Sequence, residues 1–149
     1  MKSLLLALAL ELALVAPAAA HEYRSGQLII SHPVLRVASP VSKTGAGYMT
    51  ISNNGKVADR LLSVATTAAT RSDLHGSFAQ GNVMQMRAQA GGVPIPAGGR
   101  VAFAPGGLHV MFIGLKSPLP VGTRLKAQLH FQQAGRVNVE FTTQGFGSP

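Results

Sequence analysis

Short stretches of alternating apolar and polar residues, separated by glycine- and proline-rich turns, are the feature that most restricts how this chain can fold. They recur about every ten residues, a spacing typical of all-β proteins. The sequence shows no convincing amphipathic helix. We therefore predict a single domain with an all-β sandwich fold. The expected strands are 24–31, 48–51, 61–64, 71–78, 83–87, 101–103, 108–112, 124–131 and 136–142.

Glycine, proline and asparagine mark the expected breaks between these strands. Pro33 is predicted to end the first strand, because proline cannot donate a hydrogen bond to a strand ladder. The Asn-Asn-Gly sequence at 53–55 gives the strongest tight-turn signal in the chain. Residues 39–47 and 91–99 are predicted to form loops and turns because of their Ser, Pro and Gly content.

The first twenty residues have the pattern of a secretory signal peptide. Lys2 is followed by an apolar run over 4–15 and then by Ala18-Ala19-Ala20, which matches an A-x-A cleavage signal. The run is too short for an ordinary membrane span. We therefore predict that residues 1–20 are removed after Ala20 during export, which leaves a mature domain of residues 21–149 without stable membrane insertion.

The chain is strongly basic, with a formal net charge of +8 at pH 7. Removal of residues 1–20 takes away one Lys and one Glu, so the charge remains +8. The Lys and Arg residues are spread singly, which disfavours nucleic acid as a partner and favours acidic protein surfaces or an anionic membrane face. The absence of cysteine excludes both a disulfide framework and thiol-disulfide exchange by this chain.

Four candidate ligands for a soft metal occur between His75 and Met111. Ten residues separate His75 from Met86, twenty-two separate Met86 from His109, and one separates His109 from Met111. Thioether sulfur suits Cu(I), and imidazole suits copper in either oxidation state. This set therefore predicts a Cu(I) site ahead of zinc, calcium or magnesium. A strand methionine is usually core packing and a lone histidine is usually structural, so the prediction depends on the joint pattern.

Strand alternation predicts where these side chains point. In 108–112 the apolar residues share one face, and His109 and Met111 share the other. His75 directly follows the apolar Leu74, so their side chains point to opposite faces of the strand and His75 too can point away from the core. The site therefore requires a sheet that brings three segments together.

The two methionines of the 83–87 strand need separate treatment. Met84 and Met86 share one face of this strand. Only one of them is needed to complete the four ligands. We expect Met84 to pack in the core, although the sequence leaves open whether it could replace Met86.

The sequence also resembles the periplasmic copper chaperone family, written PCu(A)C. The resemblance rests on GAGYMTISNNG, DRLLSV, NVMQMR, GGVPIPAGG and PGGLHVMFIGLKSPL. Members of that family bind Cu(I) through a motif of His, ten residues, Met, about twenty-one residues, and His-x-Met. In this chain the second gap is one residue longer. Many relatives carry Met where this chain has Ser77 and an aromatic residue where it has Val34, but neither difference removes one of the four ligands.

The resemblance implies the fold, the cargo and the role of the protein. It implies a cupredoxin-like Greek-key β-sandwich with Cu(I) held near one end by His75, Met86, His109 and Met111. It also implies a periplasmic chaperone, not an enzyme, that delivers copper to a cuproprotein. The implied acceptor is the copper centre of cytochrome c oxidase, through subunit II or its assembly factors. The chain lacks the cysteine that a blue-copper electron-transfer site requires.

Two other functions remain open from the sequence. If His21 becomes the N-terminus, its amine and imidazole could chelate Cu(II), as in a Cu(II)-binding protein or a copper enzyme. The chain could instead be a β-sandwich binding module that uses its basic surface and no metal. His32 is expected to be structural. His130 is expected to be exposed, because the residues on either side of it in the strand are apolar and should point to the core.

Overall fold

The structure, a computed structural model, describes residues 21–146 as eleven strands with no helix. This confirms the predicted all-β class. The predicted signal peptide, residues 1–20, lies outside the described residues. Between residues 21 and 146 there is no helix that is long and apolar enough to cross a membrane. The strands are β1 (Glu22–Ser25), β2 (Leu28–Val37), β3 (Thr44–Asn53), β4 (Asp59–Ala65), β5 (Ala69–Gln80), β6 (Val83–Ala88), β7 (Val93–Ile95), β8 (Arg100–Phe103), β9 (Leu108–Leu115), β10 (Arg124–Phe131) and β11 (Gly135–Gly145).

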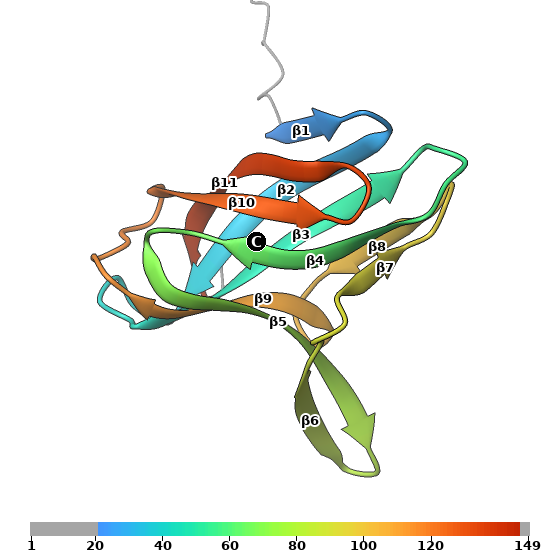
Figure 1. Ribbon diagram of the computed structural model, residues 1–149. Coiled ribbons are helices and arrows are strands. Elements are labelled where there is room, and N and C mark those ends of the chain that lie inside the picture. The colour runs from blue at the N-terminus through green and yellow to red at the C-terminus, as the bar shows by residue number, and fades with distance from the viewer. Residues whose placement is uncertain (1–20, 147–149) are drawn as a thin grey trace, which may run out of the picture.

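The strands form one curled sheet whose order is β6-β5-β9-β8-β3-β2-β11-β10-β4-β7 (Figure 1). Strand β1 pairs with β2, and β9 also pairs with β3. Strand β11 runs parallel to β2, and β8 runs parallel to β9, while the other pairs are antiparallel. The order places β6 at one end of the sheet, beside β5, so that only one side of β6 is paired with another strand.

The inner face of the curled sheet encloses a single hydrophobic core. Burial alternates along β2 and β10, as the period of two predicts. The rings of Phe112 and Phe141 meet edge to face with centroids 5.4 Å apart. Each fully buried side chain of this size contributes about 1.5–3 kcal/mol by leaving water. Met49 is 2% exposed and packs in the core, as strand methionines usually do.

The first long strand continues through Pro33, contrary to the predicted break. Ser31 pairs with Thr50 and Val34 pairs with Tyr48, so two residues of β2 oppose one residue of β3. This is a β-bulge, and His32 adopts a φ of 53° within it. Because the bulge already interrupts the ladder, the missing N–H of Pro33 leaves no partner unpaired. Glycine and proline content therefore indicated a local irregularity rather than the end of a strand.

Strand β3 begins at Thr44, inside the predicted loop, because its glycines make room for the core. A Cβ atom on Gly47 would lie 2.9 Å from the Phe112 ring and 3.1 Å from the Phe141 ring. The predicted turn region 91–99 likewise contains the short strand β7, which pairs with β4 and buries Val93 and Ile95. Strand β7 is the last in the sheet order, an edge position that tolerates Pro94.

Candidate metal centre

The four predicted ligands lie on one face of three adjacent strands, β6, β5 and β9. His75 of β5 pairs with His109 of β9, and Ser77 of β5 pairs with Met86 of β6. Paired residues point to the same side of a sheet, and so do residues two apart on one strand. His75, Met86, His109 and Met111 therefore share a face, as the predicted alternation requires.

The two methionines flank the histidine pair at distances that their side chains can cover. Met86 is a diagonal neighbour of His75 across the β5–β6 pair. Such neighbours lie about 7–8 Å apart, within reach of a long side chain. Met111 is two residues from His109 on β9. The unbranched methionine side chain has three rotatable bonds, so both sulfurs can swing toward the imidazoles.

The imidazoles of His75 and His109 lie close together and largely away from solvent. Their ring centroids are 5.7 Å apart and the rings are nearly perpendicular, at 84°. His109 is only 5% exposed, although it lies on the face opposite the main core. The side chain of His75 is 19% exposed. The two rings form the inner part of the site, and the exposed Met86 side chain lies at its rim.

Hydrogen bonding fixes which nitrogen of His109 can bind a metal. Its Nδ1 lies 3.1 Å from the carbonyl oxygen of Gly107. A carbonyl can only accept, so Nδ1 carries the proton and donates it. The lone pair of the neutral ring therefore lies on Nε2. A backbone carbonyl that orients a histidine in this way is a common feature of metal sites.

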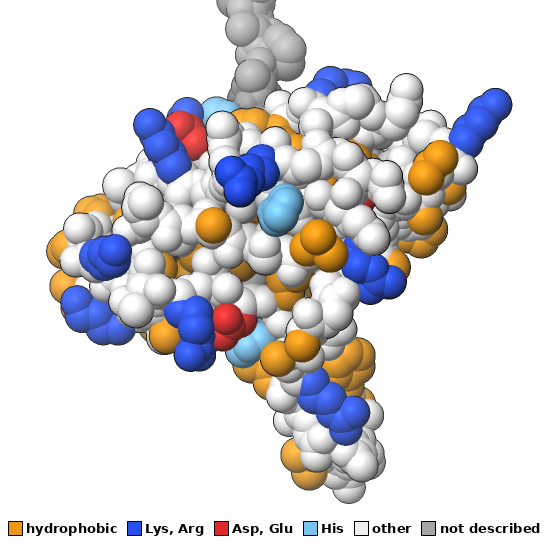
Figure 2. All heavy atoms as spheres, in the orientation of Figure 1, with side chains coloured by type: hydrophobic (Ala, Val, Ile, Leu, Met, Phe, Trp, Pro, Cys, Tyr) orange, Lys and Arg blue, Asp and Glu red, His pale blue; other side chains and the backbone are white. Residues whose placement is uncertain are grey.

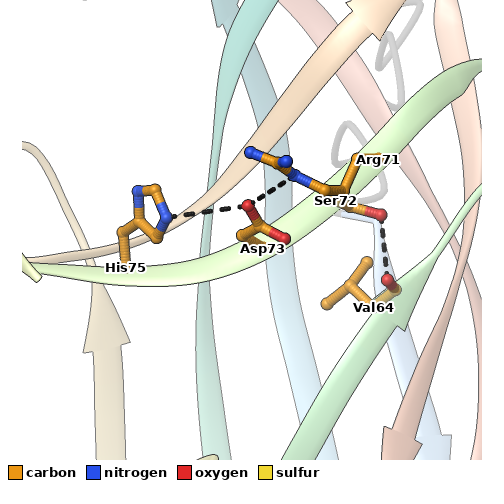
Figure 3. Close-up of polar contacts among 5 residues, drawn as sticks. All are labelled: Val64, Arg71, Ser72, Asp73 and His75. Carbon is orange, nitrogen blue, oxygen red and sulfur yellow. Dashed lines mark hydrogen bonds and ion pairs between the residues drawn. The ribbon is translucent and has the colours of Figure 1, made fainter. Parts of the chain in front are cut away.

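For His75 the available nitrogen is Nδ1. Its Nε2 lies 3.8 Å from Oδ2 of Asp73, and the same oxygen accepts a hydrogen bond of 2.9 Å from Nε of Arg71 (Figure 3). This separation is too long for a hydrogen bond, but the negative Asp73 carboxylate favours an N–H at Nε2 and therefore the lone pair on Nδ1. That Nδ1 is buried and has no hydrogen-bond partner among the described residues. A buried polar atom without a partner costs about 1–3 kcal/mol, so a ligand at this nitrogen would remove a real penalty.

Sulfur is needed for a metal site here. Between residues 21 and 146 there is no group of three or more His, Cys, Asp or Glu side chains placed to hold a metal ion. The two histidines need the thioethers of Met86 and Met111 to reach four ligands. A set of two imidazoles and two thioethers fits Cu(I), whereas zinc sites use histidine, cysteine and carboxylate ligands.

Two residues near the histidines, Asp73 and Tyr48, were not predicted from the sequence. Asp73 pairs with Met111 across β5 and β9, and Tyr48 lies one residue beyond the Gly47–Val110 pair of β3 and β9. Burial raises the pKa of the Tyr48 phenol, and the Arg36 guanidinium opposes part of that rise. The phenol therefore stays neutral at ordinary pH. The position of Asp73 two residues before His75 was the signal for its place on this face.

Met84 does not pack in the core, so that prediction was wrong. It pairs with Ala79, lies on the same face as Met86, and is 59% exposed. The hairpin of β5 and β6 projects from the body of the domain as an arm (Figure 1). Alternation correctly predicted the shared face of the two methionines, but no second layer of the described structure covers it.

The other three histidines contact parts of the fold outside β5, β6 and β9. His130 of β10 is exposed, as predicted. His21 is exposed, with its Nε2 3.2 Å from Nη2 of Arg124 and its carbonyl bonded to the N–H of His32. His75 and His109 are therefore the two histidines that the sheet brings together.

Comparison with known proteins identifies a family for the whole domain. A family model described as "Putative lipoprotein LpqE-like" matches residues 28–143. "Putative lipoprotein Lxx21020" from Leifsonia xyli subsp. xyli (strain CTCB07) is 29% identical over 101 residues, which cover 68% of this chain and 61% of that relative. The chain thus spans less than two thirds of that relative's length.

Solved structures with the same fold include both apo and copper-bound proteins. The apo PCuAC domain from PmoF1 is 30% identical with a TM-score of 0.71, covering 84% of this chain and 99% of that domain. The copper-bound PCuAC domain from PmoF2 is 27% identical with a TM-score of 0.70, covering 84% and 98%. The Cu(I) form of DR1885 from Deinococcus radiodurans is 28% identical with a TM-score of 0.63, covering 87% and 83%.

These matches confirm the predicted cupredoxin-like β-sandwich. The family model covers most of the chain, and the solved domains align over nearly their whole length. The chain therefore belongs to the LpqE-like, PCuAC family of copper chaperones.

Proposed function

We propose that this protein carries one Cu(I) ion between His75, Met86, His109 and Met111. The observation that carries this proposal is the meeting of two histidines whose available nitrogens are Nδ1 of His75 and Nε2 of His109, on a face that they share with Met86 of β6 and Met111 of β9. The copper-bound and Cu(I)-bound relatives support the same cargo.

The chemistry of the ligands suits a carrier. All four ligands are neutral, so the site carries only the positive charge of the ion. The carboxylate of Asp73, beside His75, can balance that charge. The set holds Cu(I) without the grip of a thiolate, so an acceptor with cysteine ligands can remove the ion. The protein thus acts as a chaperone and not as an enzyme.

The proposed place of work is the periplasm, with residues 1–20 as the export signal cleaved after Ala20 and residues 21–149 as the chaperone domain. The signal-like apolar run and Ala18-Ala19-Ala20 support the export signal and its cleavage, and the lipoprotein descriptions of the matching family and relative support export. The proposed acceptor is the copper centre of cytochrome c oxidase, through subunit II or its assembly factors. The basic surface of the protein, with Lys and Arg dispersed over the face in Figure 2, favours encounter with acidic proteins.

X-ray absorption of the Cu(I)-loaded protein tests the ligand set. We expect two nitrogen and two sulfur neighbours, and we expect one sulfur to be lost in Met111→Leu. A first shell made only of nitrogen and oxygen would contradict the proposal. Delivery is tested separately by mixing the loaded protein with the soluble copper domain of oxidase subunit II. Copper should move to that domain, and retention by the carrier would contradict the proposed acceptor.

The two alternatives receive less support. A Cu(II) site at His21 would place a dication beside the guanidinium of Arg124, which lies 3.2 Å from the ring nitrogen. A binding module without a metal would leave the buried Nδ1 of His75 without a role. Mass spectrometry of the exported protein tests the first alternative, because a terminus other than His21 removes it.

A further inference from the structure

The inner ligands of the proposed site are poorly placed to meet an acceptor protein. His109 is 5% exposed and Nδ1 of His75 is buried. An acceptor cannot contact these nitrogens directly while the body of the domain keeps its shape. Release of copper therefore requires a ligand that is both near the site and open to solvent.

The projecting arm of β5 and β6 offers two such ligands in line. Met86 pairs with Ser77 and Met84 pairs with Ala79, so both thioethers lie on the face that begins at His75. Each methionine is 59% exposed. They are two residues apart on one strand, about 6.6 Å between Cα atoms. One ion can therefore contact both sulfurs.

The surroundings of Met84 leave its side chain free to move. On the same face it pairs with the small residue Ala79, and its next neighbours on the hairpin are Ser77 and Met86. Met84 makes no contribution to the core, although methionine is commonly used there. Figure 2 shows hydrophobic side chains along this arm, beside a basic side chain. A mobile soft ligand is thus kept on the outer half of the arm.

We propose that Met84 is a transfer ligand, which binds Cu(I) as the ion leaves the histidines and presents it to the acceptor. This inference rests on the proposed Cu(I) carrier function. In the step, a bond from copper to a histidine nitrogen breaks as a bond from copper to the Met84 sulfur forms. Copper remains Cu(I), no electron moves, and no proton is released, because both ligands are neutral. The ion moves along the arm, away from the buried rings.

The test compares Met84→Leu with Met86→Leu and with a matched control, Val83→Ala. Val83 is 60% exposed on the opposite face of the same strand. Affinity is measured by anaerobic competition with a chromophoric Cu(I) chelator. Transfer is measured by stopped flow from the loaded protein to a peptide with a Cys-Xaa-Xaa-Cys pair. Met84→Leu should keep Cu(I) affinity within about twofold and slow transfer by about tenfold, which corresponds to about 1.4 kcal/mol in the barrier. Val83→Ala should change neither.

A second measurement reports whether the Met84 sulfur can reach the ion. In Met86→Leu, X-ray absorption should still show two sulfur neighbours, because Met84 replaces the lost ligand. The double variant Met84→Leu/Met86→Leu should show one. A purely structural role for Met84 would not change this count.

Three results would overturn the proposal. Transfer from Met84→Leu at the parent rate would remove the role while leaving the carrier function intact. A loss of affinity in Met84→Leu equal to that in Met86→Leu would make Met84 a resident ligand instead. Failure of the parent protein to bind Cu(I) would remove the carrier function and this inference together, and the parent titration alone identifies that case.

Discussion

His75 and His109 face each other across the antiparallel pair of β5 and β9, with ring centroids 5.7 Å apart and ring planes at 84°. The His109 ring is hydrogen-bonded to the Gly107 carbonyl, and Nε2 of the His75 ring lies 3.8 Å from the Asp73 carboxylate. The opposite nitrogen of each ring is left free.

Asp73→Asn should weaken Cu(I) binding by about tenfold, in the range found when residues that orient metal ligands are changed. The amide removes the negative charge that favours a proton on Nε2 of His75, so Nδ1 is less often the free nitrogen. Competition titration measures the effect. Glu140→Gln is the matched control, because Glu140 is also 30% exposed and pairs with an arginine, Arg124, on other strands. Equal losses in the two variants would point to general electrostatics instead.

Because Tyr48 is partly buried, the free energy of unfolding should decrease as the pH rises above about 10, the ordinary pKa of tyrosine. Burial raises the folded-state pKa of this phenol. The contribution of this group is therefore fully present below the unfolded-state pKa. It is lost as the pH rises through the folded-state pKa, because the unfolded chain ionises first. Urea denaturation at pH 8 and at pH 11 should show a smaller decrease in the unfolding free energy for Tyr48→Phe than for the parent. An equal decrease would contradict the assignment.

Gly47→Ala should destabilise the fold by about 1–3 kcal/mol, the usual cost of forcing extra volume into a packed core. The added methyl group would meet the Phe112 ring at 2.9 Å and the Phe141 ring at 3.1 Å. Gly91→Ala is the control, since nothing lies within 4 Å of its added Cβ. Urea denaturation compares the two. A Gly47→Ala variant as stable as the parent would show that the two rings can move apart without cost.

Much of the site could be predicted because strand alternation is a local property. His109 precedes the apolar Val110 and His75 follows the apolar Leu74, so alternation predicted that both histidines point away from the core. The structure places them on one face, as a pair across β5 and β9. The spacing of Met86 and Met111 gave the two sulfur candidates. Tyr48 was missed because its place near His109 depends on the register between distant strands, which local patterns do not contain. Asp73 was missed although its position two residues before His75 placed it on the same face.

The errors have a common physical origin. Alternation identifies the face of a residue but not what covers that face, so Met84 was expected in the core and is exposed. Glycine and proline were taken as signs of loops in regions that contain strands. Gly47 instead makes room for the Phe112 ring, and Pro33 lies in a bulge. Their roles follow from tertiary packing, which overrides local preference.

Anaerobic Cu(I) titration of residues 21–149 against a chromophoric competitor shows whether His109 belongs to a Cu(I) site. His109→Ala removes the inner imidazole, and His130→Ala removes an exposed imidazole on β10 as the matched control. The proposed carrier function predicts one tightly bound equivalent in the parent and in His130→Ala, and its loss in His109→Ala. It would be contradicted by a parent that binds no Cu(I), or by a His109→Ala variant that binds it as tightly as the parent.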